Sequence, residues 1–533
     1  MRHRFWLVVT VLSIAVVHSF GAAAPALQGP TIPPFELDEM TVAQLQDAMA
    51  NGRYTSRRLV DLYLQRIEAI DRNGPALRSV IEVNPDAQSI ADALDAERKT
   101  KGSRGPLHGI PVLIKDNIDT ADRMSTTAGS LALEGSIAAR DAFIVTRLRA
   151  AGAVILGKTN LSEWANFRSM KSASGWSGRG GQVRNPYILD RNACGSSSGT
   201  GAAVAANLAA IGVGTETDGS IVCPSNASGL VGLKPTIGLV SRSGIIPISE
   251  TQDTAGPMTR TVADAAALLT AMTGADPRDA ATARAPKAAV DYTKALDPKA
   301  LKGARIGVAR QRFFGYSPSA DRLADAAIAT LKAQGAVIVD PADIPTAARL
   351  DGCELEILLY EFKAGLNAYL KGLGPKAKVH SLEELIAFNE REKEREMPFF
   401  GQDIFLLAQK KGPLTSPAYR KALTACSRLS RTQGIDAAMT KHRLDAIIAP
   451  TGSPAWPIDP VNGDHFLGAS STPAAVAGYP NINVPSGLAH GLPVGISFIG
   501  APWTEAKLLS YAYAYEQATK HRRPPEFLPT LKQ

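Results

Sequence analysis

The sequence predicts an α/β protein with a large central sheet that is mixed or mostly parallel. Apolar residues at helical spacing alternate along the chain with short apolar runs bounded by glycine or proline. The order helix, glycine, apolar strand occurs twice, around Gly152 and around Gly335. The chain has 533 residues, of which 45% are apolar and 20% are charged, so it can bury a large core.

The first helices are predicted from their capping residues. Thr41 begins a helix in which Gln44 completes a capping box, and Gly52 ends it. Thr55 is the predicted N-cap residue of a second helix, whose apolar residues share one face. The segment 25–40 before these helices is rich in proline, and we expect an extended linker there.

The strands are predicted from apolar runs that follow or precede these helices. A strand over 110–114 delivers Lys115 at its carboxyl end. A helix through Ile144 and Leu148 precedes a strand over 153–156, and a helix over 323–331 precedes one over 336–339. Two further strands are predicted late in the chain, over 446–449 and 494–499.

The composition of two other segments predicts helices of different environment. Residues 202–208 are small and alanine-rich, which predicts a buried helix whose N-terminus lies beside Ser196 and favours negative charge there. Charges alternate in sign over 390–396, which predicts a solvated helical face. The stretch 310–433 contains no functional motif. We expect its charged segment to have a structural role only.

The N-terminus has the pattern of a secretory signal peptide. Arg2 and Arg4 precede an apolar stretch over 5–17, which small residues at 21–24 follow. The stretch is shorter than the roughly 20 residues of a membrane-spanning helix. We therefore expect a signal peptide over 1–24, a linker over 25–40 and a single catalytic domain over 41–533. The alternative is an uncleaved anchor. After cleavage we expect an exported protein, periplasmic or secreted, with no membrane insertion.

Charge, histidine and cysteine usage narrow the possible partners. The formal net charge is +8, but 58 basic and 50 acidic residues are interspersed, so no nucleic-acid partner is predicted. The histidines lack metal-ligand spacing, so no zinc site is predicted, and no other cofactor is expected. Cys194 and Cys223 are predicted to lie close together, as buried thiols in preference to a disulfide. We expect a monomer or a simple homodimer.

Two serines and a lysine can form a nucleophile that needs no histidine. Ser196 and Ser220 stand 24 positions apart in one glycine-rich stretch, and Lys115 ends an apolar strand. A serine hydroxyl requires a base to take its proton during attack on an amide. Burial lowers the pKa of a lysine, and a neutral lysine can serve as that base, with the second serine as a bridge.

These residues lie in motifs that resemble those of the amidase-signature family. The matching stretches are 105–117, 157–160, 194–201, 214–224, 229–238 and 491–495. The resemblance implies an α/β/α fold with helices on both faces of the sheet. It also implies a Ser–cis-Ser–Lys triad with Ser220 as nucleophile, Ser196 as bridge and Lys115 as base. The oxyanion turn falls on four consecutive residues: Thr217, Asp218, Gly219 and Ser220.

Finer features resemble bacterial peptide amidases, which hydrolyse the C-terminal carboxamide of peptides to the free acid and ammonia. The turn reads Gly-Thr-Glu-Thr-Asp-Gly-Ser, with Asp218 where the commoner family form has glycine. The stretches 160–167 and 240–247 also resemble those of bacterial peptide amidases. The Asp218 carboxylate is expected to contact either the substrate or a neighbouring loop. The expected partner is a peptide amide or another small-molecule amide.

Several other functions remain open. Fatty-acid and aryl amide hydrolases share the triad, and so do glutaminase subunits of transfer-RNA amidation. Gly195-Ser-Ser-Ser-Gly199 also fits an α/β-hydrolase elbow with Ser197 as nucleophile, which would need His442, His465 or His490. A phosphate-binding loop is disfavoured because the Gly-Lys-Ser/Thr ending is missing. The last alternative is an exported ligand-binding protein without catalysis.

Overall fold

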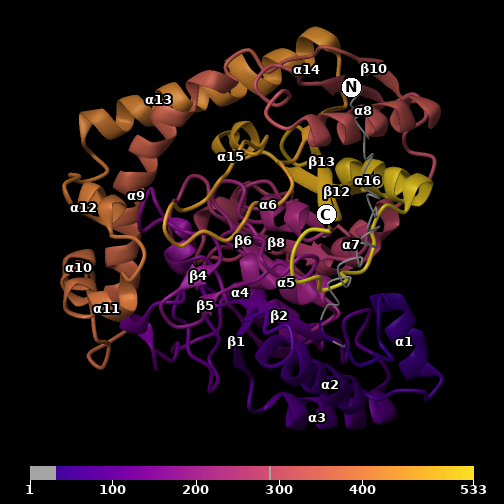
Figure 1. Cartoon of the computed structure of the whole chain (residues 1–533), viewed down its shortest axis with the longest axis vertical. Coiled ribbons are helices and arrows are strands. Elements are labelled where there is room, and N and C mark those ends of the chain that lie inside the picture. The colour runs from indigo at the N-terminus through magenta and orange to yellow at the C-terminus, as the bar shows by residue number, and fades with distance from the viewer. Residues whose placement is uncertain (1–29, 31, 287–289, 533) are drawn as a thin grey trace, which may run out of the picture.

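The centre of the molecule is one eleven-stranded sheet, seen in the computed structural model of residues 30, 32–286 and 290–532 (Figure 1). The predicted signal segment lies outside the described residues. The strands follow one another across the sheet in this order: β1 (Val80–Val83), β3 (Val154–Thr159), β2 (Pro111–Lys115), β6 (Ile211–Glu216), β8 (Thr254–Thr259), β7 (Val231–Lys234), β12 (Asn481–Ala489), β13 (Leu492–Ile499), β11 (Ala446–Pro450), β9 (Arg305–Val308) and β10 (Val337–Val339).

The sheet is mixed, and its parallel pairs lie near its two ends. β3, β2 and β6 run parallel at one end, as do β11, β9 and β10 at the other. The strands from β6 through β8, β7, β12 and β13 to β11 pair antiparallel. The edge strand β1 pairs antiparallel with β3, and the predicted mixed sheet is confirmed. The antiparallel centre includes a hairpin, β12–β13, which needs no helical crossover.

Helices cover the sheet, and the sequence signals placed several of them. Thr41 and Gln44 form the predicted capping box of α1, and Thr55 caps α2. The principal helices are α1 (Val42–Ala50), α2 (Ser56–Arg66), α3 (Ala87–Lys101), α4 (Phe143–Ala150), α5 (Ser198–Ala205), α6 (Val222–Ala227), α7 (Val262–Met272), α8 (Pro318–Ala333), α14 (Asp436–His442), α15 (Thr472–Ala477) and α16 (Glu505–Thr519).

The two faces of the sheet are buried in different apolar clusters. On β11, Ala446 and Ile448 belong to the largest core cluster, whereas Ile447 and Ala449 belong to a second cluster that includes Ala474 of α15. Successive residues of a strand point to opposite faces. Both faces are therefore covered, as the α/β/α prediction requires.

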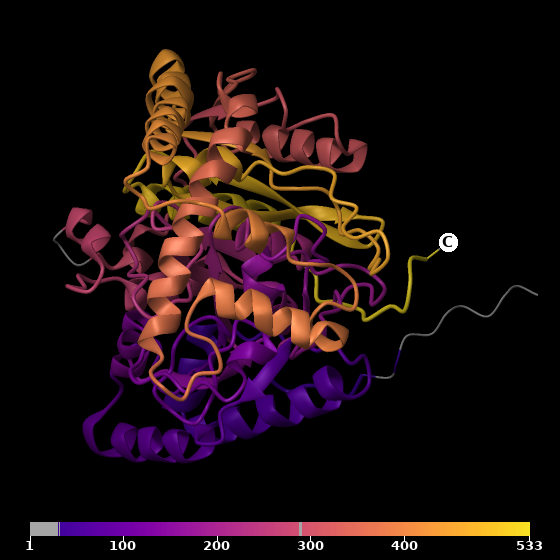
Figure 2. The same ribbon diagram turned by 90° about the vertical axis from the view of Figure 1, so that its left-hand side faces the viewer.

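The motif-free stretch forms a layer of helices beside the sheet. It contains α9 (Asp351–Gly372), α10 (Leu382–Arg391), α11 (Lys393–Glu396), α12 (Asp403–Gln409) and α13 (Pro417–Ser430). Figures 1 and 2 show these orange helices along one side of the molecule. A disulfide between Cys353 and Cys426 joins α9 to α13. Within the described residues no helix is both long and apolar enough to cross a bilayer.

One prediction for this layer holds with a single exception. The charged segment 390–396 is largely solvated, as predicted, but its last residue, Glu396, is fully buried. Its Oε1 accepts hydrogen bonds from Ser130 Oγ (2.9 Å) and from the Leu131 backbone N–H (2.6 Å). Arg168 Nη1 lies 3.7 Å from its Oε2. A buried charge requires such partners, and these stand more than two hundred residues away in the sequence.

Candidate active site

Lys115 ends β2 inside the protein, as the apolar run predicted, and its side chain is fully buried. The Nζ atom lies 2.7 Å from Ser196 Oγ and 2.9 Å from Thr215 Oγ1. It also donates to the Thr215 carbonyl at 3.3 Å. Thr215 lies on β6, the neighbouring strand in the sheet. The pairing of β2 with β6 therefore brings the amine to the glycine-rich stretch.

Burial lowers the pKa of Lys115 from its usual value to about 7. Loss of hydration disfavours the charged ammonium and is the dominant cause. The nearby carboxylates of Asp253 and Glu216 act in the opposite direction, and they limit the fall. A substantial fraction of the amine is therefore neutral near pH 7 and able to accept a proton.

Ser196 is fully buried in the loop that leads into α5. The Gly195–Ser196 peptide bond is cis. The helix itself begins at Ser198, four residues before the predicted start, because Ser197 is its N-cap residue. Small side chains from Ser198 onwards allow α5 to lie fully buried beside the strands.

Ser220 lies next to this loop, with 8% of its surface exposed. Its carbonyl accepts a hydrogen bond from the Ser197 backbone N–H at 3.2 Å. No hydrogen bond within 3.5 Å joins the hydroxyls of Ser196 and Ser220 in this structure, although both residues are described. Lys115, Ser196 and Ser220 therefore lie in one place, with the lysine in contact with the first serine.

The turn before Ser220 is held on both sides. Thr217 Oγ1 donates to Asp253 Oδ1 at 2.5 Å, and Thr472 Oγ1 donates to Asp218 Oδ2 at 2.7 Å. Gly219 has a φ of +76°, which favours glycine, and a Cβ there would lie 3.0 Å from Ser471 Oγ. The Asp218 carboxylate thus contacts a neighbouring segment, one of the two contacts that were expected. Burial raises its pKa.

Sequence reasoning missed the role of Glu216, the last residue of β6. Its buried carboxylate accepts hydrogen bonds from the backbone N–H groups of Ile221 (2.8 Å) and Val222 (3.0 Å), at the start of α6. A carboxylate at a helix N-terminus is stabilising because it satisfies unpaired donors. The sequence does show an acidic residue just before a glycine-containing turn. The backbone N–H groups that this residue binds depend on the geometry of the turn, which the sequence does not give.

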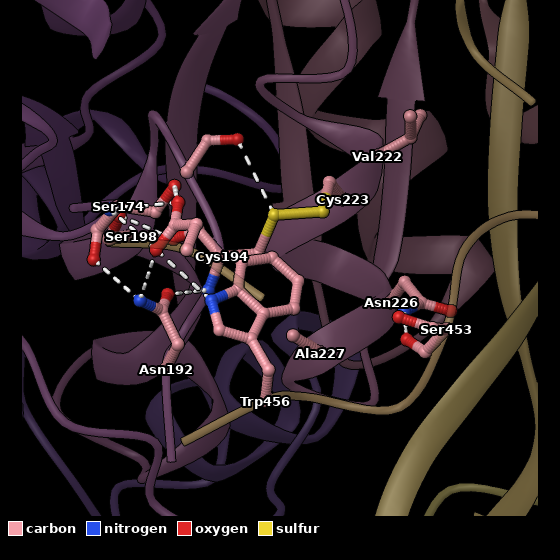
Figure 3. Close-up of a disulfide and its surroundings, with 12 residues drawn as sticks. Ser174, Asn192, Cys194, Ser198, Val222, Cys223, Asn226, Ala227, Ser453 and Trp456 are labelled. Carbon is pink, nitrogen blue, oxygen red and sulfur yellow. Dashed lines mark hydrogen bonds between the residues drawn. A yellow bond between two sulfur atoms is a disulfide. The ribbon is translucent and has the colours of Figure 1, made fainter. Parts of the chain in front are cut away.

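A disulfide joins Cys194 to Cys223, where buried thiols were predicted (Figure 3). The Cα atoms lie 5.9 Å apart, which is within the range that a disulfide requires. The bridge connects the loop before Ser196 to helix α6 after Ser220. The sequence separation of 29 residues does not by itself show that these two segments meet. The bridge ties together the segments that contain the two serines.

Removing this disulfide is expected to lower both stability and activity. We predict that a Cys194→Ala/Cys223→Ala variant loses about 3 kcal/mol of unfolding free energy, together with most of any catalytic turnover that depends on Ser196 and Ser220. A Cys353→Ala/Cys426→Ala variant is the matched control and should lose stability alone, because its bridge joins α9 to α13. Denaturant unfolding and turnover assays measure both effects. Equal loss of activity in the two variants would contradict the prediction.

The α/β-hydrolase alternative has no support in the geometry. The Ser197 hydroxyl donates to the Thr215 carbonyl (3.0 Å) and accepts from the Thr215 backbone N–H (3.2 Å). His465 contacts Asp459, and none of the hydrogen bonds of the described residues joins Ser197 to a histidine. Ser197 therefore holds β6 against the start of α5.

A cleft of about 580 Å³ opens beside the turn and the disulfide. Gly195, Asp218 and Gly219 line it on one side, and Trp456 lines it on another. Trp164 and Phe167 belong to an apolar core cluster, and Trp176 packs edge-on against Phe400. The cleft has the volume of an ordinary small-molecule site.

Comparison with known proteins identifies the class. Residues 58–509 match the family model described as Amidase. The chain is 43% identical to a probable amidase of Arabidopsis thaliana, with 98% of this chain and 97% of the relative covered. These matches span most of the chain. The protein belongs to the amidase family and is an amide hydrolase.

Solved structures narrow the similarity further. The native peptide amidase of Stenotrophomonas maltophilia is 53% identical, with a TM-score of 0.88, over 92% of this chain and 99% of that one. A peptide amidase in complex with the competitive inhibitor chymostatin is also 53% identical, with a TM-score of 0.89, over 92% and 100%. The amidase fold and the resemblance to peptide amidases, both expected from the sequence motifs, are confirmed.

Proposed function

We propose that the protein hydrolyses the C-terminal carboxamide of peptides to the free acid and ammonia. One observation carries the proposal. A buried lysine with a pKa of about 7 contacts Ser196 at 2.7 Å beside Ser220, in a chain 53% identical to peptide amidases. Such a lysine can accept a proton near neutral pH, which an amide-cleaving serine requires.

Ser220 is the nucleophile in this mechanism. Its oxygen attacks the carboxamide carbon, its proton moves to Ser196 Oγ, and the proton of Ser196 moves to neutral Lys115 Nζ. The 2.7 Å contact then has the serine hydroxyl as donor and the neutral amine as acceptor. The hydroxyl of Ser220 rotates towards Ser196 when substrate is bound, since apo contacts often tighten in the complex.

The turn stabilises the negative charge that develops on the substrate oxygen. Backbone N–H groups of the turn over 217–220 are the proposed donors, and loss of one such donor typically costs about 10²–10³-fold in rate. The proton returns from Lys115 through Ser196 to the departing nitrogen, which leaves as ammonia. Water then attacks the acyl-enzyme by the same route and releases the acid.

An ammonia-release assay separates the proposed substrate from the alternatives. The panel comprises peptide amides, a fatty-acid primary amide, an aryl amide and glutamine. The last three are the substrates of the alternative amide hydrolases. We expect peptide amides to be preferred, with internal peptide bonds left uncut when products are analysed by mass spectrometry. A preference for any other member would replace the proposed substrate. Absence of turnover throughout would favour a binding protein.

We infer that the protein is exported. The charged and apolar pattern of residues 1–24 supports this, and the two disulfides are of the kind that persists in oxidising compartments. Fractionation of the source cells, with N-terminal sequencing of the purified protein, tests the inference. We expect a chain that begins near residue 25 outside the cytoplasm. A cytoplasmic protein that retains residues 1–24 would contradict it.

A further inference from the structure

Three large apolar side chains surround the mouth of the cleft. Met170 is 66% exposed, Leu467 is 59% exposed and Phe466 is 50% exposed, and all three line the cleft. We call these three residues the apolar rim. Exposed apolar side chains scattered singly are ordinary, but a group at the mouth of a cavity is typical of a binding surface.

The Phe466 side of the rim is fixed by the half-buried carboxylate of Asp464. Asp464 accepts hydrogen bonds from the Trp456 indole N–H (3.0 Å), from Asn192 Nδ2 (3.1 Å) and from the Ser174 backbone N–H (3.1 Å). The ring of Trp456 packs edge-on against Phe466, with centroids 5.6 Å apart. Figure 3 shows Trp456 and Asn192 beside the disulfide. This side of the rim is therefore attached to the loop that leads to Ser196.

The Met170 side is fixed by α12. The Met170 backbone N–H donates to Asp403 Oδ2 at 3.1 Å, and Ser169 Oγ donates to the other oxygen of that carboxylate. Asp403 is the first residue of α12. The rim therefore lies on anchored segments, which present its side chains without a large ordering cost.

We propose that the apolar rim selects peptide amides with large apolar side chains in the residues before the amidated one. The inference rests on the proposed function, since it names the class of peptide. Gly195 and Gly219 line the same cleft, and each directly precedes one of the two serines, Ser196 and Ser220, in the chain. A peptide whose amide reaches Ser220 must pass outwards through the mouth, so its preceding side chains meet the rim. Charges of both signs line the cleft, since Asp218 and Asp464 supply carboxylates and Arg312 supplies a guanidinium, so the apolar rim is the feature that distinguishes apolar from small side chains.

The test compares substrates that reach the rim with one that does not. We expect Leu-Leu-Ala-amide and Gly-Gly-Ala-amide to be long enough to reach the rim, whereas N-acetylalaninamide lacks the preceding residues that would contact it. We expect kcat/KM for the leucine peptide to exceed that for the glycine peptide by about tenfold, from the burial of apolar surface. A Met170→Ser/Leu467→Ser variant should reduce this ratio to about one, because kcat/KM falls more for the leucine peptide than for the glycine peptide or for N-acetylalaninamide.

A matched control and a second measurement keep the test decisive. Ile137 is 50% exposed and does not line the cleft, so Ile137→Ser should retain the tenfold ratio. Equal kcat/KM for both peptides in the unaltered enzyme would overturn the inference and leave the proposed function intact. Failure to hydrolyse any peptide amide would overturn both. A dimer in analytical ultracentrifugation that the double variant dissociates would also overturn the inference, because the rim would then bind a second copy.

Discussion

Replacing Ser220 with alanine is expected to lower kcat for amide hydrolysis by about 10⁴-fold or more, the scale seen when a serine nucleophile is removed. The alanine lacks the oxygen that forms the acyl-enzyme, and no other hydroxyl takes its place. Ser196 is bound to Lys115, and Ser197 is bound to the Thr215 backbone. The fold should persist, since the structural contact of Ser220 is made by its carbonyl. Turnover and thermal unfolding measure the two effects.

Ser225→Ala is the control for this variant. Ser225 is buried on α6, five residues after Ser220, and its hydroxyl has no hydrogen-bond partner. Removing that hydroxyl should therefore leave both turnover and stability close to their original values. Labelling provides an independent measurement, because a fluorophosphonate should modify Ser220 alone. An adduct on any other side chain, or an active Ser220→Ala enzyme, would refute the assignment of the nucleophile.

Activity is expected to fall as pH decreases through about 7, because only the neutral form of Lys115 can accept the proton. Below this pKa, the neutral fraction and kcat/KM should both decrease about tenfold for each pH unit. Lys115→Met should remove nearly all activity at every pH, since methionine has no proton acceptor. If Lys115→Met keeps most of its activity at pH 7, another group is the base.

Replacing a carboxylate near Lys115 tests whether protonation of Lys115 causes the fall of kcat/KM at low pH, which we call the acidic limb of the pH profile. The Asp253 carboxylate raises the pKa of Lys115 by favouring its ammonium form. Asp253→Asn removes that charge and retains the shape of the side chain, so the pKa of Lys115 should fall. The acidic limb of kcat/KM should then move to lower pH. If the acidic limb stays at the same pH or moves to higher pH, the group that titrates there is not Lys115.

Much of the site could be predicted because its residues lie in short local motifs. Lys115 follows an apolar run, and the capping residues Thr41 and Thr55 act within three or four positions of themselves. The helix–glycine–strand order likewise predicted β3 and β10, each of which directly follows its helix and glycine. In each case the neighbours in sequence are also the neighbours in space.

The errors occur where the decisive partner is distant in the chain. Glu396 has the neighbours of a solvated residue, but Ser130 and Leu131 give it a buried site. Cys194 and Cys223 were expected to be close, yet only the crossing of their segments decides that a bridge joins them. The predicted mixed sheet is confirmed, but the sequence did not place its antiparallel centre, since strand direction is a property of the whole topology.

By itself the sequence determined the amidase motifs, the chemistry that a lysine and two serines offer, and the class of fold. Those properties depend on residue type and on short spacing. The tertiary structure alone decided that Lys115 is buried enough to lose its proton near neutral pH, that Thr472 holds Asp218, and that an apolar rim surrounds the cleft. Burial and hydrogen bonding are set by whichever segments pack around a side chain, and in a 533-residue chain most of those segments come from elsewhere.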